Sequence, residues 1–182
     1  MQIIELTVTL EHVKPTVLRI IEVPLGIRLD QLHLTLQAAM GWENAHLYMF
    51  MAADSRWGVP DPAFGGDELP ASETTLEEAL SRSNVKTLQY LYDFGDDWMH
   101  RIDAGKISDA NSGKSYPNLT EADGKCPPED VGGAPGYEEF LEAMTDTKHS
   151  EHKKFKDWHG DIFAPNKLET EKLKLDVLKL AK

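Results

Sequence analysis

The sequence is poor in cysteine, arginine and long apolar runs, and each shortage excludes a class of protein. Its single cysteine, Cys126, cannot form an internal disulfide, which is typical of a protein of the reducing cytoplasm. Its apolar runs are far shorter than the roughly 20 residues that a membrane-spanning helix needs. The first residues lack the basic and then apolar pattern of a signal peptide. We therefore expect a cytoplasmic protein without a membrane partner.

Positive charge is also scarce. The 182 residues include 19 Lys and Arg against 31 Asp and Glu, which gives a formal net charge of -12. Nucleic-acid binding draws most of its affinity from Lys and Arg side chains that neutralise phosphates, so this composition argues against a nucleic-acid partner. The 41% hydrophobic content is that of a globular chain, and this length suits one domain that buries its own core.

The pattern of apolar residues predicts an α+β fold with a mainly antiparallel, mixed sheet and packed helices. Residues 3–11 and 17–23 alternate as the two strands of a hairpin, and a helix follows from Asp30 to a stop at Gly41. The same patterns predict further strands at 46–52, 87–92 and 98–107, and helices from residue 74, at 137–144, at 151–158 and from residue 169. Stretches 54–70 and 108–136, rich in turn-forming residues, are expected to be loops. The first four elements suit a ubiquitin-like β-grasp core.

Asp93-Phe94-Gly95 spells the magnesium-binding signature of protein kinases, but the chain lacks the glycine-rich loop and the catalytic loop that a kinase needs. The triplet instead opens an acidic turn that includes Asp96, with His100 on the following strand. Two interpretations stay open. The aspartates accept hydrogen bonds from backbone amides of the turn, or their oxygens bind a divalent cation such as Ca²⁺, Mg²⁺ or Mn²⁺.

A second acidic pair, Glu129 and Asp130, follows Cys126 in the long connection after the hairpin. Such a connection gains stability by packing back on the sheet, so we expect this pair to meet the hairpin turn. Grouped carboxylates repel one another unless a cation or a basic side chain compensates. The cleft that we predict, with a cation or a nearby Lys, is lined by Asp93, Asp96, His100, Glu129 and Asp130.

The stretch Tyr92-Asp93-Phe94-Gly95-Asp96, followed by Trp98 and His100, resembles the signature of the plasmid pRiA4b ORF-3-like family. Further matching segments are Lys14-Pro15 with Val23-Pro24, Leu32-His33 through Ala38-Ala39-Met40-Gly41-Trp42 to His46-Leu47 and Phe50, and Cys126-Pro127-Pro128-Glu129-Asp130 with Gly132-Gly133 and Gly136-Tyr137. The resemblance implies a single domain over residues 1–182, with its core at about 4–163 and a C-terminal helical tail at about 164–182. It also implies a prokaryotic protein, in a family often found near mobile elements, and it brings no established activity. Asp97 and the segment Phe163-Ala164-Pro165 depart from the family pattern.

Trp42 and His46 flank a turn after the first long helix. One interpretation makes Trp42 a core residue and lets His46 bond a backbone carbonyl. The other, which follows from their place beside Trp98 and His100 in the resemblance, is a shared binding groove.

Three hypotheses of function follow. The first is a non-enzymatic binding module for an unidentified protein or small molecule, because no catalytic constellation is complete. The second is a metal-dependent hydrolase that uses Asp93, Asp96 and His100 with Glu129 and Asp130. The third is a DNA-binding accessory protein of transposition, which rests on the resemblance alone.

Overall fold

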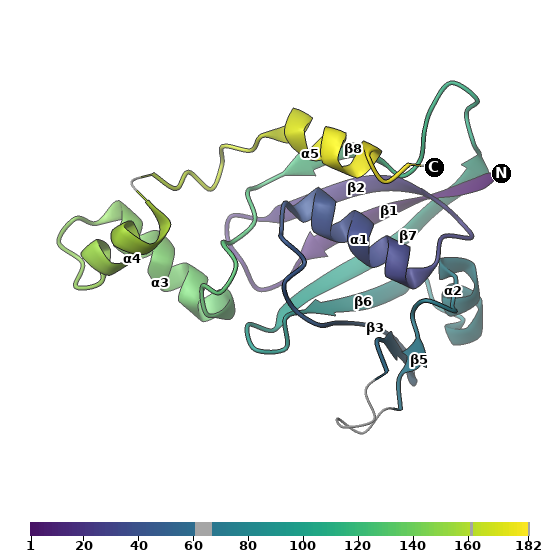
Figure 1. The fold of residues 1–182 in the computed structure, drawn as a ribbon, viewed down its shortest axis with the longest axis horizontal. Coiled ribbons are helices and arrows are strands. Elements are labelled where there is room, and N and C mark those ends of the chain that lie inside the picture. Colours follow the sequence, from purple (N-terminus) through teal and green to yellow (C-terminus); the bar gives the residue numbers. More distant parts are fainter. Residues whose placement is uncertain (61–66, 161, 182) are drawn as a thin grey trace.

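The computed structural model describes residues 1–60, 67–160 and 162–181, and one eight-stranded sheet forms its centre (Figure 1). The strands are β1 (Gln2–Leu10), β2 (Val17–Pro24), β3 (Tyr48–Ala52), β4 (Ser55–Gly58), β5 (Leu69–Pro70), β6 (Thr87–Tyr92), β7 (Trp98–Asp109) and β8 (Asn118–Asp123). They are arranged in the order β5-β4-β3-β6-β7-β1-β2-β8. Among the strands of the described residues, β4 and β5 alone pair in parallel, so the predicted α+β fold with a mainly antiparallel, mixed sheet is confirmed. A ubiquitin-like β-grasp core is not shown by this sheet.

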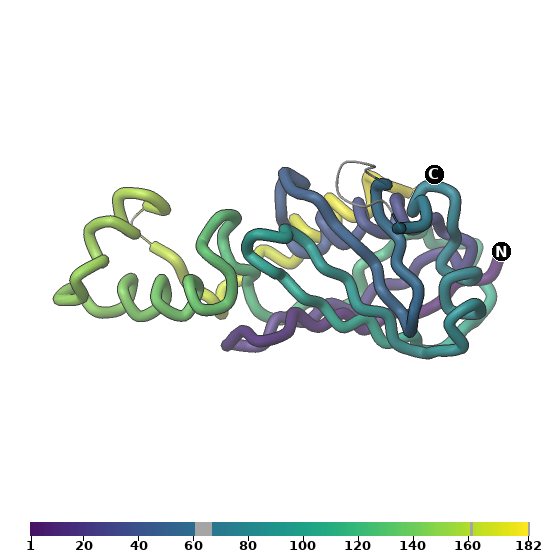
Figure 2. The backbone as a smooth tube through the Cα atoms, turned by 90° about the horizontal axis from the view of Figure 1, so that it is seen from below, coloured from purple at the N-terminus to yellow at the C-terminus, as the bar shows by residue number. Residues whose placement is uncertain are grey.

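Five helices accompany the sheet in the described part of the chain: α1 (Leu29–Met40), α2 (Leu76–Ser83), α3 (Gly133–Thr145), α4 (His152–His159) and α5 (Thr170–Leu178). Helix α1 lies across one face of the sheet, and α5 packs beside it against α1 and β8 (Figure 1). Helices α3 and α4 pack on each other and extend from one end of the sheet, as Figure 2 shows from a second direction. None of the helices in these described ranges is long and apolar enough to cross a membrane.

The core follows from the alternation of side chains along the strands. Leu6, Val8 and Leu10 of β1 are buried at every second position, and Val17 and Ile21 of β2 complete the same layer. Strands β1 and β2 pair antiparallel, which confirms the predicted hairpin. Burial of these aliphatic side chains is the main force that holds the sheet to α1.

Helix α1 ends where the sequence predicts. Gly41 adopts the left-handed conformation at φ 83°, and its N–H donates to Gln37 O at 2.9 Å. Asp30 lies in the first turn rather than at the cap, which is Arg28 and has no side-chain cap bond. The turn that follows Gly41 carries the next segment, including Trp42 and His46, back toward the sheet.

The hairpin of β6 and β7 positions the acidic turn. Tyr92 pairs with Trp98 and Tyr90 pairs with His100, and all four side chains are buried on one face. The turn closes with a hydrogen bond from Asp97 N–H to Asp93 O at 2.7 Å. The predicted strands at this hairpin are therefore confirmed.

Two segments expected to be loops contain strands. Strands β4 and β5 lie within 54–70, of which residues 61–66 fall outside the described part, and β8 lies within 108–136. Each of these strands pairs with a neighbour in the sheet, β4 with β3, β5 with β4 and β8 with β2. The loop predictions were wrong there. These segments form strands because a neighbouring strand provides hydrogen-bond partners, and the local turn-rich sequence gives no sign of that partner.

Candidate functional site

Four side chains from three separate segments meet beside the hairpin turn, and we call them the His46 cluster: His46, Asp93, Glu129 and Asp130. The Nε2 atom of His46 lies 3.1 Å from Asp130 Oδ1, 3.5 Å from Asp93 Oδ2 and 3.7 Å from Glu129 Oε2. This nitrogen is shielded from solvent and has no hydrogen bond of acceptable angle, so the contacts are those of charge and proximity. The fold thus gathers three carboxylates around one imidazole.

Asp93 serves the turn and the cluster at once. Its Oδ1 accepts hydrogen bonds from Gly95 N–H at 2.9 Å and from Asp96 N–H at 3.4 Å. Its Oδ2 points to His46, and the residue is 7% exposed with φ 56°. Asp tolerates this left-handed conformation better than most residues, because its short side chain bonds the local backbone. The turn-stabilising interpretation therefore holds for one oxygen and leaves the other available to a ligand.

Glu129 is fixed by a phenol and a backbone amide. Tyr92 OH donates to its carboxylate at 3.1 and 3.2 Å, and Glu43 N–H donates to Oε1 at 2.8 Å. The same Tyr92 oxygen accepts from Ala45 N–H at 3.0 Å. Burial, and then the negative charge of Glu129, raise the pKa of Tyr92 far above its usual value, so the phenol stays a donor. Tyr92 was not among the predicted site residues.

Asp130 and Asp96 hold different places. The side chain of Asp130 is 71% exposed and forms the outer edge of the cluster. Asp96 forms no ion pair with His46 in the described structure, and its Oδ2 accepts from Gly132 N–H at 3.1 Å instead. A Cβ at Gly133 would collide with Asp96 O, so the two segments lie backbone against backbone. Asp96 thus fastens the connection to the hairpin, and the convergence of these segments agrees with the packing argument from the sequence.

Trp42 and His100 form a buried layer next to the cluster. Trp42 Nε1 donates to Pro127 O at 3.0 Å, and its ring stacks on Tyr92 with centroids 5.0 Å apart. His100 is 0% exposed and meets Trp42 edge-on, with ring centroids 5.4 Å apart. His100 Nδ1 lies 2.9 Å from the carbonyl oxygen of Trp98, so this nitrogen carries the proton. His100 was predicted to line the cleft, but it lies in the core.

Burial lowers the pKa of His100 to about 4, so the imidazole is neutral at physiological pH. Its Nε2 has no partner in the described structure. A neutral, buried imidazole that faces aromatic rings is a packing group rather than a ligand exposed to solvent.

A second buried network holds the segment that carries His46. His33 Nδ1 lies 2.8 Å from Tyr90 OH, and His33 Nε2 lies 2.6 Å from Asn44 Oδ1. Gln37 closes the network, because its Nε2 donates to Tyr90 OH at 3.0 Å and its Oε1 accepts from Asn44 N–H at 3.1 Å. Asn44 has φ 56° and begins the approach to His46. The signal in the sequence was a histidine and a glutamine, four positions apart, on the helix face that packs on the sheet.

Arg19 is a further buried charge that was not predicted. Its guanidinium donates to Ala39 O and to Asp123 O, both at 2.7 Å, and to Cys126 Sγ at 3.4 Å. Its place between the inward-facing Val17 and Ile21 was the available signal. Burial raises the pKa of the Cys126 thiol to about 11, although Arg19 opposes the shift. The thiol is therefore protonated, in line with a structural role.

The comparisons with known proteins agree with this architecture. The sequence profile of the family described as plasmid pRiA4b ORF-3-like protein matches residues 2–172. The chain belongs to this family.

Two known proteins are similar to this pRiA4b ORF-3-like chain, one in sequence and one in structure. It is 46% identical over 158 residues to the uncharacterized protein y4hQ of Sinorhizobium fredii (strain NBRC 101917 / NGR234), which covers 87% of this chain and 81% of that protein. It also matches the crystal structure of a protein of unknown function, MM3350 from Methanosarcina mazei Go1, with a TM-score of 0.84 and 29% identity. That match covers 93% of this chain and 96% of the other. Neither protein brings a function to this one.

The fold brings three of the pRiA4b ORF-3-like motifs together. The segments around Trp42 to His46, Tyr92 to Asp96 and Cys126 to Asp130 carry the resemblance, and these three segments build the His46 cluster. Residues far apart in the sequence therefore share one place on the molecule.

Proposed function

We propose that this protein is a non-enzymatic binding module that holds a divalent cation at the His46 cluster. One observation carries the proposal: the imidazole nitrogen of His46 faces three carboxylate groups at 3.1 to 3.7 Å. These groups come from segments that the fold must bring together, and each occupies a defined position.

The charge of the cluster supports a bound cation. Within the described residues, Asp93, Glu129 and Asp130 form ion pairs with His46. None of these three carboxylates forms an ion pair with a Lys or an Arg there. Three carboxylates against one protonated imidazole leave two negative charges in excess, and a neutral imidazole leaves three. Like charges at such short separations repel strongly where water is partly excluded. A divalent cation offsets this repulsion.

The spacing also suits a metal. Bonds of about 2.0 to 2.2 Å place the ligand atoms of a tetrahedral site about 3.3 to 3.6 Å apart. Ligand atoms of His46, Asp93 and Asp130 all lie within 4.8 Å of one another, so a small inward movement completes the site. A nitrogen with carboxylate oxygens favours Zn²⁺ or Mn²⁺ over Ca²⁺ and Mg²⁺, which prefer oxygen ligands alone.

Isothermal titration of the EDTA-treated and dialysed protein tests the proposal. We expect one saturable site for Zn²⁺ and for Mn²⁺, with much weaker binding of Mg²⁺ and Ca²⁺. His46→Gln and Asp130→Asn should each weaken binding at least roughly tenfold, in line with the loss of a ligand. Asp97→Asn is the matched control, because Asp97 lies in the same turn and outside the cluster. Absence of heat with all four metals, or parental affinity in His46→Gln, would contradict the proposal.

A metal-dependent hydrolase is the second candidate, and one observation favours it. A set of three protein ligands leaves a coordination position for water, as in catalytic zinc sites. The carboxylate of Glu129, held by Tyr92, lies beside that set and could take a proton from such a water. Hydrolysis of p-nitrophenyl phosphate or p-nitrophenyl acetate that depends on Zn²⁺ or Mn²⁺, and is lost in Glu129→Gln, would support this candidate. Metal binding without turnover would support the binding module.

We also propose a location, an origin and a class of partner for this protein. The single cysteine supports a cytoplasmic protein, and the family resemblance supports a prokaryotic origin near mobile elements. A DNA-binding accessory role gains no support from the net charge of -12. The partner of the binding module would be a protein or a small molecule.

A further inference from the structure

A groove of about 630 Å³ lies beside the His46 cluster, and we call it the lysine groove. It is lined by the end of α1 with Gly41 to Glu43, by residues 125–129, and by parts of the C-terminal segment between His159 and Leu173. Its volume falls in the range of about 300 to 1,000 Å³ that is usual for small-molecule sites. Glu129 lines the groove and also belongs to the cluster, so the two sites adjoin.

The walls of the groove are fixed by specific contacts. Lys125 N–H donates to Pro165 O at 2.8 Å, and Lys125 Nζ lies 4.7 Å from the centre of the Phe163 ring. Helix α5, which also contributes to the lining, packs against α1 and β8, and its Leu173 is buried. The C-terminal segment is therefore held against the sheet, and the groove is largely formed before any ligand binds.

Three lysines contribute to the lining of the groove. Lys125, Lys167 and Lys172 line it, although the chain as a whole carries a net charge of -12. Within the described residues, none of these three has a carboxylate as an ion-pair partner within 4.0 Å. Lysines of α5 outside the groove differ, because Lys174 pairs with Glu171 at 2.9 Å and Lys179 pairs with Asp176 at 2.6 Å.

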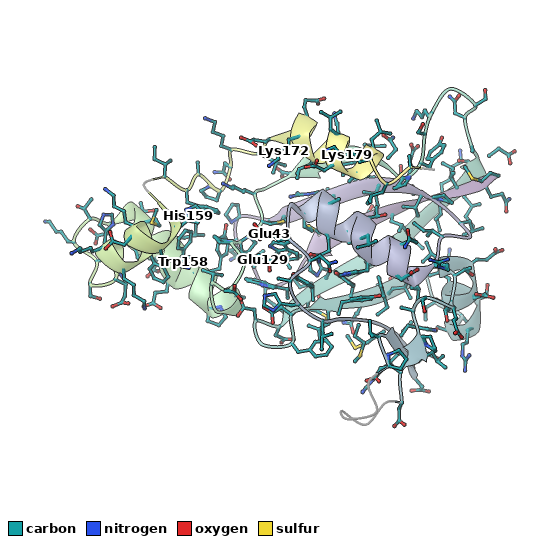
Figure 3. All side chains as sticks on the ribbon, viewed as in Figure 1. Glu43, Glu129, Trp158, His159, Lys172 and Lys179 are labelled. Carbon is teal, nitrogen blue, oxygen red and sulfur yellow. The ribbon has the colours of Figure 1, made fainter. Side chains whose placement is uncertain are left out.

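The acidic residues of the groove are placed differently. Glu43 and Glu129 lie together next to the cluster, and Figure 3 shows Lys172 on α5, away from that pair. The carboxylate of Glu129 accepts hydrogen bonds from Tyr92 OH and from Glu43 N–H, and it keeps its negative charge. Glu169, at the start of α5, is the other carboxylate among the lining residues. Glu43 and Glu129 therefore mark an acidic end of the groove, and Lys172 lies away from that end.

Much of the remaining lining is apolar. Of these side chains Met40, Trp42 and Leu173 are buried, and Phe163 and Leu168 are half-buried. Ile162 at the rim is 82% exposed, which is a large exposed fraction for an isoleucine. Such a surface gains free energy when the apolar part of a ligand covers it.

We infer that the lysine groove binds a small amphipathic molecule with one anionic group. The anionic group faces Lys125, Lys167 and Lys172, and the apolar body lies on Ile162, Phe163 and Leu168. Glu43 and Glu129 repel a second anionic group at the other end, so a monoanion is preferred to an elongated dianion. This site adjoins the proposed cation site through Glu129 and needs no metal.

Titration with the fluorescent anion 8-anilinonaphthalene-1-sulfonate, in EDTA, tests the inference. We expect one saturable site whose affinity falls roughly tenfold in the double variant Lys167→Gln/Lys172→Gln, since two exposed charge contacts are lost. The double variant Lys174→Gln/Lys179→Gln is the matched control, because it removes the same charge from the same region outside the groove. Parental affinity in the first variant, or equal loss in both, would overturn the inference.

Two further arms make the test specific. N-phenyl-1-naphthylamine, which lacks the sulfonate, should bind at least several-fold more weakly, and octanoate should displace the probe while octylammonium should not. His46→Gln should leave probe binding unchanged, so failure of the cation proposal and failure of this one are distinguishable. Equal binding of the neutral and anionic probes, or displacement by octylammonium, would show that lysine charge does not select the ligand. Thermal unfolding of every variant at pH 7 checks that the fold is intact.

Discussion

Acidification from pH 8 to pH 5 is expected to destabilise the protein by about 4 kcal/mol through two buried histidines. His33 and His100 are 3% and 0% exposed, and burial lowers the pKa of each to about 4. In the unfolded chain a histidine has a pKa of about 6.5. Because the folded state binds fewer protons, this contribution to stability is present above pH 6.5 and is lost as the pH falls toward 4. At pH 5 the loss is about 2 kcal/mol for each histidine.

The hydrogen bonds of His33 explain the cost of its protonation. His33 Nε2–H donates to Asn44 Oδ1, so Nδ1 carries no proton and accepts from Tyr90 OH. A proton on Nδ1 turns it into a donor and forces the Tyr90 hydroxyl to reorient. Gln37 Nε2 also donates to this hydroxyl. The extra proton on His33 therefore costs the network a hydrogen bond.

Urea unfolding followed by circular dichroism at pH 8, 6.5 and 5 measures the effect. The parent should lose about 4 kcal/mol over this range, and His33→Gln and His100→Gln should each lose about 2 kcal/mol less than the parent. His12→Asn is the control, because His12 is exposed and its φ of 65° suits Asn. A parent whose stability is flat between pH 8 and pH 5 would refute the argument, as would single variants that keep the full parental loss.

Three further predictions follow from the packing and the charge. Trp98→Ala should lower the free energy of unfolding by about 3 to 5 kcal/mol, since Trp98 is 1% exposed; a variant that unfolds in urea like the parent would contradict this. Gly133→Ala should cost at least about 1 kcal/mol, because φ is 69° and the new Cβ would collide with Asp96 O; unchanged thermal unfolding would count against the tight approach of these segments. Duplex DNA should bind weakly or not at all at physiological salt, given the net charge of -12; submicromolar affinity with a steep salt dependence in an anisotropy titration would overturn that prediction.

The parts of the fold that could be predicted are those fixed by local pattern. The alternation of β1 and β2 and the glycine stop of α1 depend on neighbours in the sequence, and the structure keeps both. Strand β8 has a mostly polar sequence in which only Leu119 is fully buried. It forms because the edge of β2 offers hydrogen bonds, and a partner more than 90 residues away leaves no local signal.

The candidate site was predictable in part for a related reason. Asp93, Glu129 and Asp130 could be expected together, since a long connection must pack on the sheet. His46 was recognised only beside Trp42, because its approach to the carboxylates depends on the buried network of α1. The buried position of His100 could have been predicted from the sequence. His100 shares a strand face with Trp98, so the alternation that places Trp98 in the core places His100 there as well.

Paramagnetic broadening by Mn²⁺ in amide-resolved NMR spectra both detects a bound ion and locates it on the molecule. With substoichiometric Mn²⁺, we expect broadening centred on the amides next to His46, Asp93 and Asp130, and loss of this pattern in His46→Gln. Excess Mg²⁺ should reverse the broadening poorly, whereas Zn²⁺ should reverse it fully. Broadening centred on another acidic region, or none at stoichiometric Mn²⁺, would contradict a cation site at the His46 cluster.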